Sequence, residues 1–177
     1  MRTIIEIGAH TGTETFKFLD DSDAVVFAFE PQQQHFTQLF LRSQHYPRLT
    51  VLPFAVDLGD NQEPLFHLDN GQDSLQPPNM IFGQYKFTMT WTIRLGTFLE
   101  LYGIQRVDYL RIDAPWNEGN CLESIDPFAD RLQTGRIKCY RDDNAELITW
   151  LYDHGFSTQI DNTSDDVTRP NIRFWRN

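Results

Sequence analysis

The sequence predicts an α/β fold with a mostly parallel central sheet, helices on both faces and an antiparallel edge strand. Two observations lead to this expectation. The apolar periodicity along the 177 residues switches repeatedly between strand-like and helix-like spacing, so strands alternate with helices. In addition, residues 24–29 are apolar throughout, which is typical of a parallel strand covered on both faces.

The first elements are a strand, a turn and a helix. Residues 3–7 alternate in the manner of a strand, and a loop that carries Gly8 and Gly12 follows. Residues 13–20 are expected to form a short helix that turns its apolar side chains inward. This order predicts a strand–turn–helix unit at the start of the sheet.

The second unit begins with the apolar strand at residues 24–29. It ends at Glu30, and the proline that follows suits the first turn of a helix. Phe36, Leu39 and Phe40 mark that helix, because their spacing places them on one face.

The middle of the chain predicts two further strands around a loop. Residues 49–54 read as the third strand, and residues 65–68 as a short strand beyond a turn. Residues 69–79 are polar and rich in Gly and Pro, so a mobile loop is expected there. Residues 86–93 alternate large apolar side chains with Lys and Thr, which predicts a half-buried strand.

The last part of the chain continues the alternation and then closes the sheet. Its strands are expected at residues 107–112, 136–140, 156–160 and 172–175, and its helices at residues 97–102, around 122–125 and at 144–154. The final two strands are joined by a polar connection, which predicts the antiparallel edge. No linker or repeat divides the chain, so residues 1–177 are expected to form one domain.

Composition and charge exclude several classes of function. With 15 Lys and Arg against 25 Asp and Glu, the net charge is −10, so a nucleic-acid partner is disfavoured. No apolar run approaches the roughly 20 residues of a membrane helix, and no signal peptide is visible, so a cytoplasmic protein without membrane contact is expected. Cys121 and Cys139 are expected to be reduced, and the Cys and His residues show no metal-type spacing.

The strongest motif is the loop Gly8-Ala9-His10-Thr11-Gly12 between the first strand and the first helix. Glycine lets a ligand approach the main chain, and the helix N-terminus offers unpaired N–H groups. His10 occupies the place of the middle glycine of G-x-G-x-x-G, which argues against NAD or FAD. S-adenosylmethionine has no pyrophosphate and tolerates the larger residue. A tight turn that binds no ligand is the alternative.

Two further strand ends predict contacts to an adenosine. Glu30 closes the second strand about 20 residues after the glycine loop, where an acid accepts hydrogen bonds from a ribose diol. The alternative is a solvated acid beside Pro31. After the third strand, Ala55 and Val56 are placed to flank the adenine and Asp57 to accept from its amine; an ordinary turn acid is equally compatible.

Asp113 ends the fourth core strand, at the edge of the sheet where open α/β folds bind ligands. The polar and aromatic stretch that follows is expected to line the reaction pocket. In it, Asp113 and Glu118 either share a general-base task or hold a cation, Trp116 forms an apolar wall and Asn117 contacts substrate. The alternative is a capped loop with a packed Trp.

Several of these stretches occur together in the order and spacing of one known family. They are residues 5–13, 26–31, 55–57 with Gly59, 106–113 and 151–156. Through them the chain resembles the FkbM family of methyltransferases over nearly its whole length. The resemblance implies a Rossmann-like class I methyltransferase fold, S-adenosylmethionine as methyl donor, and O-methylation of a sugar or other small hydroxylated acceptor.

The resemblance also implies a role for individual residues. Glu6, Gly8 and Gly12 would face the methionine part of the cofactor, and Glu30 would hold the ribose. Asp57 would meet the adenine edge, and Asp113 would stand at the reacting centre. Asp113 is the first candidate for the base and Glu118 the second.

A second hypothesis is a catalytically degenerate methyltransferase-like binding module that works through a partner. Pro115 and Trp116 favour it, because they stand where the family carries Glu-Gly. An NAD or nucleotide-sugar enzyme is disfavoured by the spacing of the glycine loop. The many aromatic residues are compatible with a homo-oligomer.

Overall fold

The computed structural model describes residues 1–67, 73–76, 86–140, 144–161 and 169–176. Within them, a seven-stranded sheet has the order β3-β2-β1-β7-β8-β10-β9. Its strands are β1 (Thr3–Ile7), β2 (Val25–Phe29), β3 (Leu49–Leu52), β7 (Tyr109–Ile112), β8 (Thr134–Lys138), β9 (Phe156–Asp161) and β10 (Asn171–Arg176). In this order, the neighbours among β3, β2, β1, β7 and β8 pair in parallel. By contrast, β10 pairs antiparallel with both β8 and β9. The predicted sheet with its antiparallel edge is therefore confirmed.

A second, smaller sheet was not predicted. It contains β4 (Phe54–Val56), β5 (Gln62–His67) and β6 (Lys86–Ile93) in the order β4-β6-β5. The strand expected at residues 49–54 divides at Pro53, which separates β3 from β4. Proline has no N–H to donate to a ladder, so the chain leaves the large sheet there and pairs with β6 instead.

Helices cover both faces of the large sheet, as predicted. They are α1 (Thr13–Asp20), α2 (Gln33–Ser43), α3 (Leu95–Leu101), α4 (Glu118–Glu123) and α5 (Ala145–Asp153). Successive strand residues point to opposite faces. Accordingly, Ile4 packs in the cluster that contains α1 and α2, and Ile5 in the cluster that contains α3, α4 and α5. On α2, Leu39 is fully buried, but Phe40, expected on the same face, is 45% exposed.

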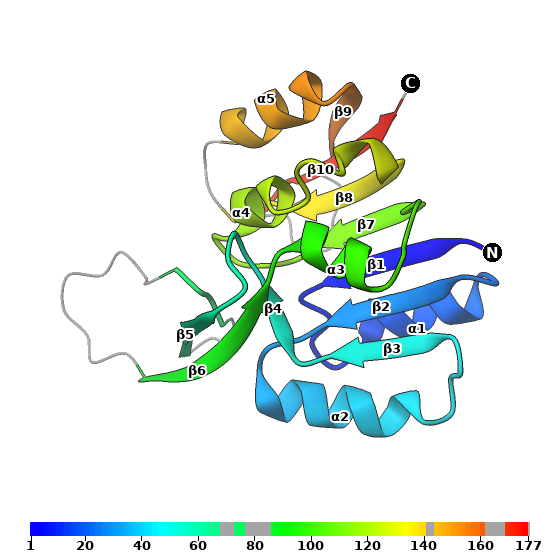
Figure 1. Cartoon of the computed structure of the whole chain (residues 1–177), viewed down its shortest axis with the longest axis vertical. Coiled ribbons are helices and arrows are strands. Elements are labelled where there is room, and N and C mark those ends of the chain that lie inside the picture. Colours follow the sequence, from blue (N-terminus) through cyan, green and yellow to red (C-terminus); the bar gives the residue numbers. More distant parts are fainter. Residues whose placement is uncertain (68–72, 77–85, 141–143, 162–168, 177) are drawn as a thin grey trace.

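The topology places the ends of several strands beside the small sheet. β1 lies between β2 and β7, so the strand order reverses at this point. In Figure 1 the arrowheads of β2, β3, β7 and β8 point toward the side on which β5 and β6 project. The loops that follow these strands therefore meet the small sheet at one edge, which is where open α/β sheets bind ligands.

Two further expectations concern segments outside this core. Of the mobile loop expected over residues 69–79, all but residues 73–76 lie outside the described residues. Residues 73–76 meet β5 through a bridge between Ser74 and Phe66. None of the helices among the described residues is long and apolar enough to cross a bilayer.

Candidate functional site

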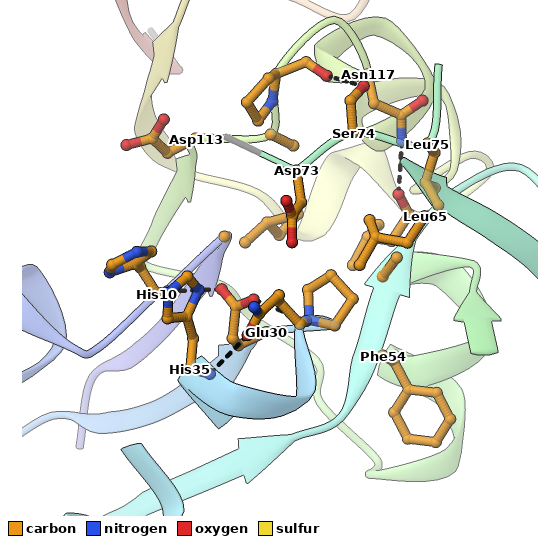
Figure 2. A pocket seen from close by; sticks show the side chains of 18 of the residues that line it. His10, Glu30, His35, Phe54, Leu65, Asp73, Ser74, Leu75, Asp113 and Asn117 are labelled. Atoms are coloured by element: carbon orange, nitrogen blue, oxygen red, sulfur yellow. Dashed lines mark hydrogen bonds between the residues drawn. The ribbon is translucent and has the colours of Figure 1, made fainter. Parts of the chain in front are cut away.

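A cavity of about 260 Å³ opens at the carboxyl ends of the parallel strands (Figure 2). It brings together eight of the residues that the sequence singled out: Gly8, His10, Glu30, Pro31, Ala55, Val56, Asp113 and Asn117. They come from the ends of β1, β2 and β7, from β4, and from the start of α4. The cavity is therefore the site to which the sequence motifs converge.

The glycine loop forms one wall of the cavity. Gly8 has a φ of 78° and His10 a φ of 52°, both in the left-handed region. The N–H groups of Gly8 and Ala9 both donate to the carbonyl oxygen of Phe29 at 3.0 Å, which ties the loop to the end of β2. A Cβ atom at Gly8 would lie 2.1 Å from the carbonyl oxygen of Asp113. Only glycine allows β1 and β7 to approach so closely.

The Glu30 carboxylate joins this loop to α2. Its Oε2 accepts from the backbone N–H of His10 at 2.7 Å, and its Oε1 from that of Gln32 at 2.9 Å. Glu30 is only 5% exposed, and this burial raises its pKa to about 7 despite the two backbone hydrogen bonds. Each carboxylate oxygen retains a second acceptor position, so Glu30 can still accept hydrogen bonds from a ligand.

Two imidazoles lie beside Glu30. The rings of His10 and His35 are 3.6 Å apart between centroids, and Figure 2 shows them at the same end of the cavity. Burial, reinforced by the neighbouring His10, holds the pKa of His35 below its ordinary value. His35 is therefore an uncharged hydrogen-bonding group near neutral pH.

A chain of hydrogen bonds runs from the cavity into the protein. The Tyr140 hydroxyl donates to Asp113 Oδ1 at 2.6 Å, and Arg111 donates to Asp113 Oδ2 at 2.8 Å. Arg111 also donates to Glu6 at 3.1 Å, and Glu6 accepts from the Thr15 hydroxyl at 2.5 Å. These contacts hold the Asp113 carboxylate in one orientation.

Glu6 belongs to this network and does not line the cavity. It is 1% exposed, and burial raises its pKa to about 7 against the opposing effect of Arg111. Its distance from the cavity surface follows from its position in β1, because the side chain of Glu6 points to the face that α1 covers, where it meets Thr15. The structure thus gives Glu6 contacts with protein groups.

Four other sequence candidates lie outside the residues that line the cavity. Glu118 is 2% exposed, and its Oε1 accepts from the backbone N–H of Tyr140 at 2.7 Å. Asp57 accepts from Asn120 at 2.7 Å. Gly12, with a φ of 87°, precedes α1, and Trp116 packs its ring 5.8 Å from that of Tyr140. Glu118 and Trp116 contact the lining residue Tyr140, whereas Asp57 and Gly12 meet residues that do not line the cavity.

The structure also adds residues that the sequence analysis missed. They are Gln32, His35, Phe54, Leu65, Asp73, Ser74, Leu75 and Tyr140, with Ile7 beside them. Ala114 and Pro115, from the stretch after Asp113 that was expected to line the pocket, also lie on the wall. Tyr140 follows β8, so the same strand-end rule that selected Asp113 points to it. Asp73 gave no such signal, because it lies in a segment without periodicity.

Asn117 is the one lining residue with an orphaned side-chain atom within the described part of the chain. Its Nδ2 donates to the carbonyl oxygen of Val56 at 3.0 Å, whereas its buried Oδ1 has no partner. An unpaired buried acceptor is costly, and a ligand with an N–H or O–H group can satisfy it.

Comparison with known proteins assigns the family. A model of the methyltransferase FkbM domain matches residues 6–158. The chain belongs to the FkbM methyltransferase family. This membership confirms the enzyme class expected from the sequence and the cofactor, S-adenosylmethionine. A comparison with curated proteins gave no significant match.

Solved structures of methyltransferases share the fold of this FkbM protein. An rRNA methylase from Streptococcus thermophilus is 11% identical with a TM-score of 0.59, over 99% of this chain and 86% of that one. TrmK of M. capricolum, in complex with S-adenosylhomocysteine, is 11% identical with a TM-score of 0.61, over 99% and 62%. Precorrin-6y C5,15-methyltransferase from Geobacter metallireducens is 11% identical with a TM-score of 0.56, over 99% and 80%. At this identity the likeness shows the class I methyltransferase fold alone.

The cavity of this FkbM protein fits the chemistry of its cofactor. A buried carboxylate, Glu30, suits a ribose diol, and the apolar side chains of Ala55, Val56 and Leu65 suit a purine ring. The unpaired Oδ1 of Asn117 is an acceptor for an amine or hydroxyl. Among the residues that the structure describes, no three His, Cys, Asp or Glu side chains group as metal ligands would.

Proposed function

We propose that this FkbM protein transfers a methyl group from S-adenosylmethionine to a hydroxyl of a sugar or another small hydroxylated acceptor. One observation carries the proposal. The same cavity holds a buried carboxylate suited to a ribose, Glu30, and a hydrogen-bonded carboxylate at the strand switch point, Asp113. The cavity therefore contains both a group suited to bind the methyl donor and a group suited to act on the acceptor.

The donor end would be held by residues from three strand ends. Glu30 would accept from the ribose hydroxyls, Ala55 and Val56 would flank the adenine, and the bare backbone of Gly8 would leave room for the methionine part. The bound cofactor would supply a methyl group from its sulfonium to the acceptor oxygen, and S-adenosylhomocysteine would remain. What the chain adds is alignment and a place for the hydroxyl proton.

Asp113 is the proposed base, with Tyr140 as its contact to the acceptor. Both oxygens of Asp113 already accept hydrogen bonds, from Tyr140 and Arg111. The acceptor proton would therefore move to the Tyr140 oxygen as Tyr140 passes its own proton to Asp113 Oδ1. Glu118, the second candidate, supports the site through the Tyr140 N–H instead.

The acceptor is proposed to be a small molecule and not a nucleic acid. Several structural neighbours are named as rRNA or RNA methylases, but the net charge of −10 opposes the approach of a phosphate backbone. The free, buried thiols of Cys121 and Cys139 suit the reducing cytoplasm in which we place the reaction.

A degenerate binding module is the second candidate function. One observation favours it: both oxygens of Asp113 already accept hydrogen bonds from protein groups, as those of a purely structural carboxylate would. Such a module would bind the cofactor and transfer no methyl group to any acceptor.

Calorimetric titration with S-adenosylmethionine and S-adenosylhomocysteine tests the donor site. Glu30→Ala is expected to weaken binding by about 1.5–3 kcal/mol, the scale of a hydrogen bond to a charged group. Glu100→Ala, at an exposed position on α3, is the control and should bind as wild type does. Thermal melting of each variant separates lost binding from lost folding.

Transfer of a tritiated methyl group to sugars and to RNA then tests the reaction. Methylation of a sugar hydroxyl that Asp113→Asn abolishes, with cofactor binding retained, is the expected result. No binding of either nucleoside by folded wild-type protein would remove the proposal. Binding without transfer to any acceptor would favour the module.

A further inference from the structure

Asp73 reaches the cavity from the segment 73–76, which one bridge joins to β5. The backbone groups of Phe66 and Ser74 exchange two hydrogen bonds, of 2.8 and 3.0 Å. In an antiparallel pair this bridge makes His67 and Asp73 the next residues opposite each other, with their side chains on one face. Figure 2 shows the Asp73 carboxylate directed into the cavity on the side of Glu30. Its place follows from this bridge to β5 and from the contact with His67.

A contact of the carboxylate with His67 and a contact of the neighbouring Ser74 hold Asp73 in place. Asp73 Oδ2 lies 3.0 Å from His67 Nδ1, and His67 Nε2 lies 3.1 Å from the Thr88 hydroxyl. The neighbouring Ser74 is 3% exposed, and its hydroxyl donates to the carbonyl oxygen of Pro115 at 2.8 Å. Asp73 Oδ1 makes no hydrogen bond within the described residues. One oxygen is therefore anchored while the other is available to a ligand.

The cavity has a one-sided charge. Three carboxylates line it, those of Glu30, Asp73 and Asp113, and no Lys or Arg is found among the described residues on its wall. Arg111 lies behind Asp113 and is paired with both Asp113 and Glu6. The His35 imidazole does not compensate, because burial keeps it uncharged near neutral pH.

We propose that Asp73, anchored by His67, selects the acceptor, and that the acceptor is an uncharged polyol whose second hydroxyl donates to Asp73 Oδ1. This inference rests on the proposed methyl transfer and narrows its acceptor. A phosphorylated sugar or a uronic acid would bring its negative charge beside Asp73 and Asp113, with no Lys or Arg among the described lining residues to pair with it. A hydroxyl beside the one that is methylated meets instead an anchored acceptor, which discriminates strongly against analogues that lack it.

The test compares matched acceptors on four proteins. The probes are neutral methyl pyranosides, the corresponding methyl glucuronide, a hexose phosphate and a deoxy pyranoside. The proteins are wild type, Asp73→Asn, His67→Gln and the control Asp23→Asn, whose carboxylate is exposed near the start of β2. Tritium transfer gives kcat/KM, calorimetry gives the Kd for S-adenosylhomocysteine, and saturation-transfer NMR reports acceptor binding without turnover.

Wild type is expected to prefer a neutral polyol over the acidic probes by about 10-fold or more in kcat/KM. Asp73→Asn should lower kcat/KM for that polyol about 10- to 100-fold, mainly through a higher KM. The ratio of its kcat/KM to those of the deoxy and acidic probes should also fall. His67→Gln should act in the same direction and more weakly. Both variants should bind S-adenosylhomocysteine within about twofold of wild type, as should Asp23→Asn.

The measurements distinguish failure of the role of Asp73, failure of the acceptor class and failure of the methyl transfer itself. If Asp73→Asn weakens S-adenosylhomocysteine instead, Asp73 serves the donor and the inference is wrong. If wild type methylates an acidic probe as well as a neutral one, or if no neutral polyol is bound or methylated, the acceptor class is wrong. The methyl transfer itself fails only if wild type binds no S-adenosylhomocysteine or methylates no acceptor.

Discussion

The Tyr140 hydroxyl donates to Asp113 Oδ1 across 2.6 Å and so joins the ends of β8 and β7 at the cavity. Burial and the neighbouring carboxylate both raise the pKa of Tyr140, so the phenol keeps its proton at neutral pH. The contact is therefore a hydrogen bond from a neutral donor to a carboxylate, which is stronger than one between neutral groups. It orients Asp113 toward the space in which an acceptor would lie.

Replacing Tyr140 by Phe removes this donor and leaves the ring in place. We expect kcat to fall about 100-fold or more, because the proton of the acceptor loses its path to Asp113. The Kd for S-adenosylhomocysteine should stay within about twofold of wild type. Steady-state kinetics and calorimetry check the two parts. Tyr152→Phe, at a residue 58% exposed on α5, is the matched control. Unchanged kcat in Tyr140→Phe would exclude the proposed proton path.

Gly8 and Gly103 offer a matched pair for backbone strain. Both have a positive φ, of 78° and 64°, but a Cβ at Gly8 meets backbone at 2.1 Å whereas one at Gly103 meets nothing within 4 Å. Gly103→Ala should therefore cost about 1 kcal/mol of unfolding free energy, from its φ alone. Gly8→Ala should cost about 3 kcal/mol or more, since β1 and β7 must separate. Urea unfolding measures both, and equal losses would contradict the close approach of the two strands.

The burial of Glu6 predicts a dependence of stability on pH. Its pKa is about 7 in the folded protein against the ordinary 4.5, so the folded state binds this proton more tightly. The resulting stabilisation is complete below pH 4.5 and is lost as the pH rises through 7. Over that range, wild type should lose on the order of 1–3 kcal/mol relative to Glu6→Gln.

Urea unfolding at several pH values measures this difference. Glu100→Gln, which replaces an exposed carboxylate, should follow the wild-type profile. If wild type instead gains stability relative to Glu6→Gln as the pH rises, the ion pair of Glu6 with Arg111 outweighs the cost of burying the charge.

The donor site should also respond to pH. Glu30 has a pKa of about 7, and its ionised form is the better acceptor for a ribose diol and the better partner for a sulfonium cation. Affinity for S-adenosylmethionine should therefore rise between pH 6 and pH 8, by up to about tenfold. Calorimetry on wild type and Glu30→Gln checks this, and the variant should show a flat profile. A wild-type affinity that falls over this range would place the titrating group elsewhere.

Much of the fold could be predicted because it depends on local patterns. The bounds of β1, α1 and β6 agree with the expected residues 3–7, 13–20 and 86–93. Their alternation of apolar and polar side chains, or the turn residues beside them, is strong enough to specify the element. The small sheet was missed, because pairing of β4 with β6 joins residues far apart in the chain and leaves no local signal.

The candidate site was predicted where it follows from strand ends and missed where it depends on packing. Gly8, Glu30 and Asp113 each follow a parallel strand, and all three line the cavity. Glu118 also follows β7 closely in sequence, but α4 begins there and turns its side chain to the N–H of Tyr140. The helix was expected around residues 122–125, whereas α4 already begins at Glu118.

By itself, the sequence determined the order of strands and helices, the glycine loop after the first strand and the family. These depend on hydrophobic periodicity, on backbone sterics and on motifs that are contiguous in the chain. Only the tertiary structure decided which acids reach the cavity. Glu6 and Asp113 both flank Arg111, yet one is sealed beneath α1 and the other lies on the cavity wall. A single bridge between Ser74 and Phe66, not any local pattern, places Asp73 opposite His67 and inside the site.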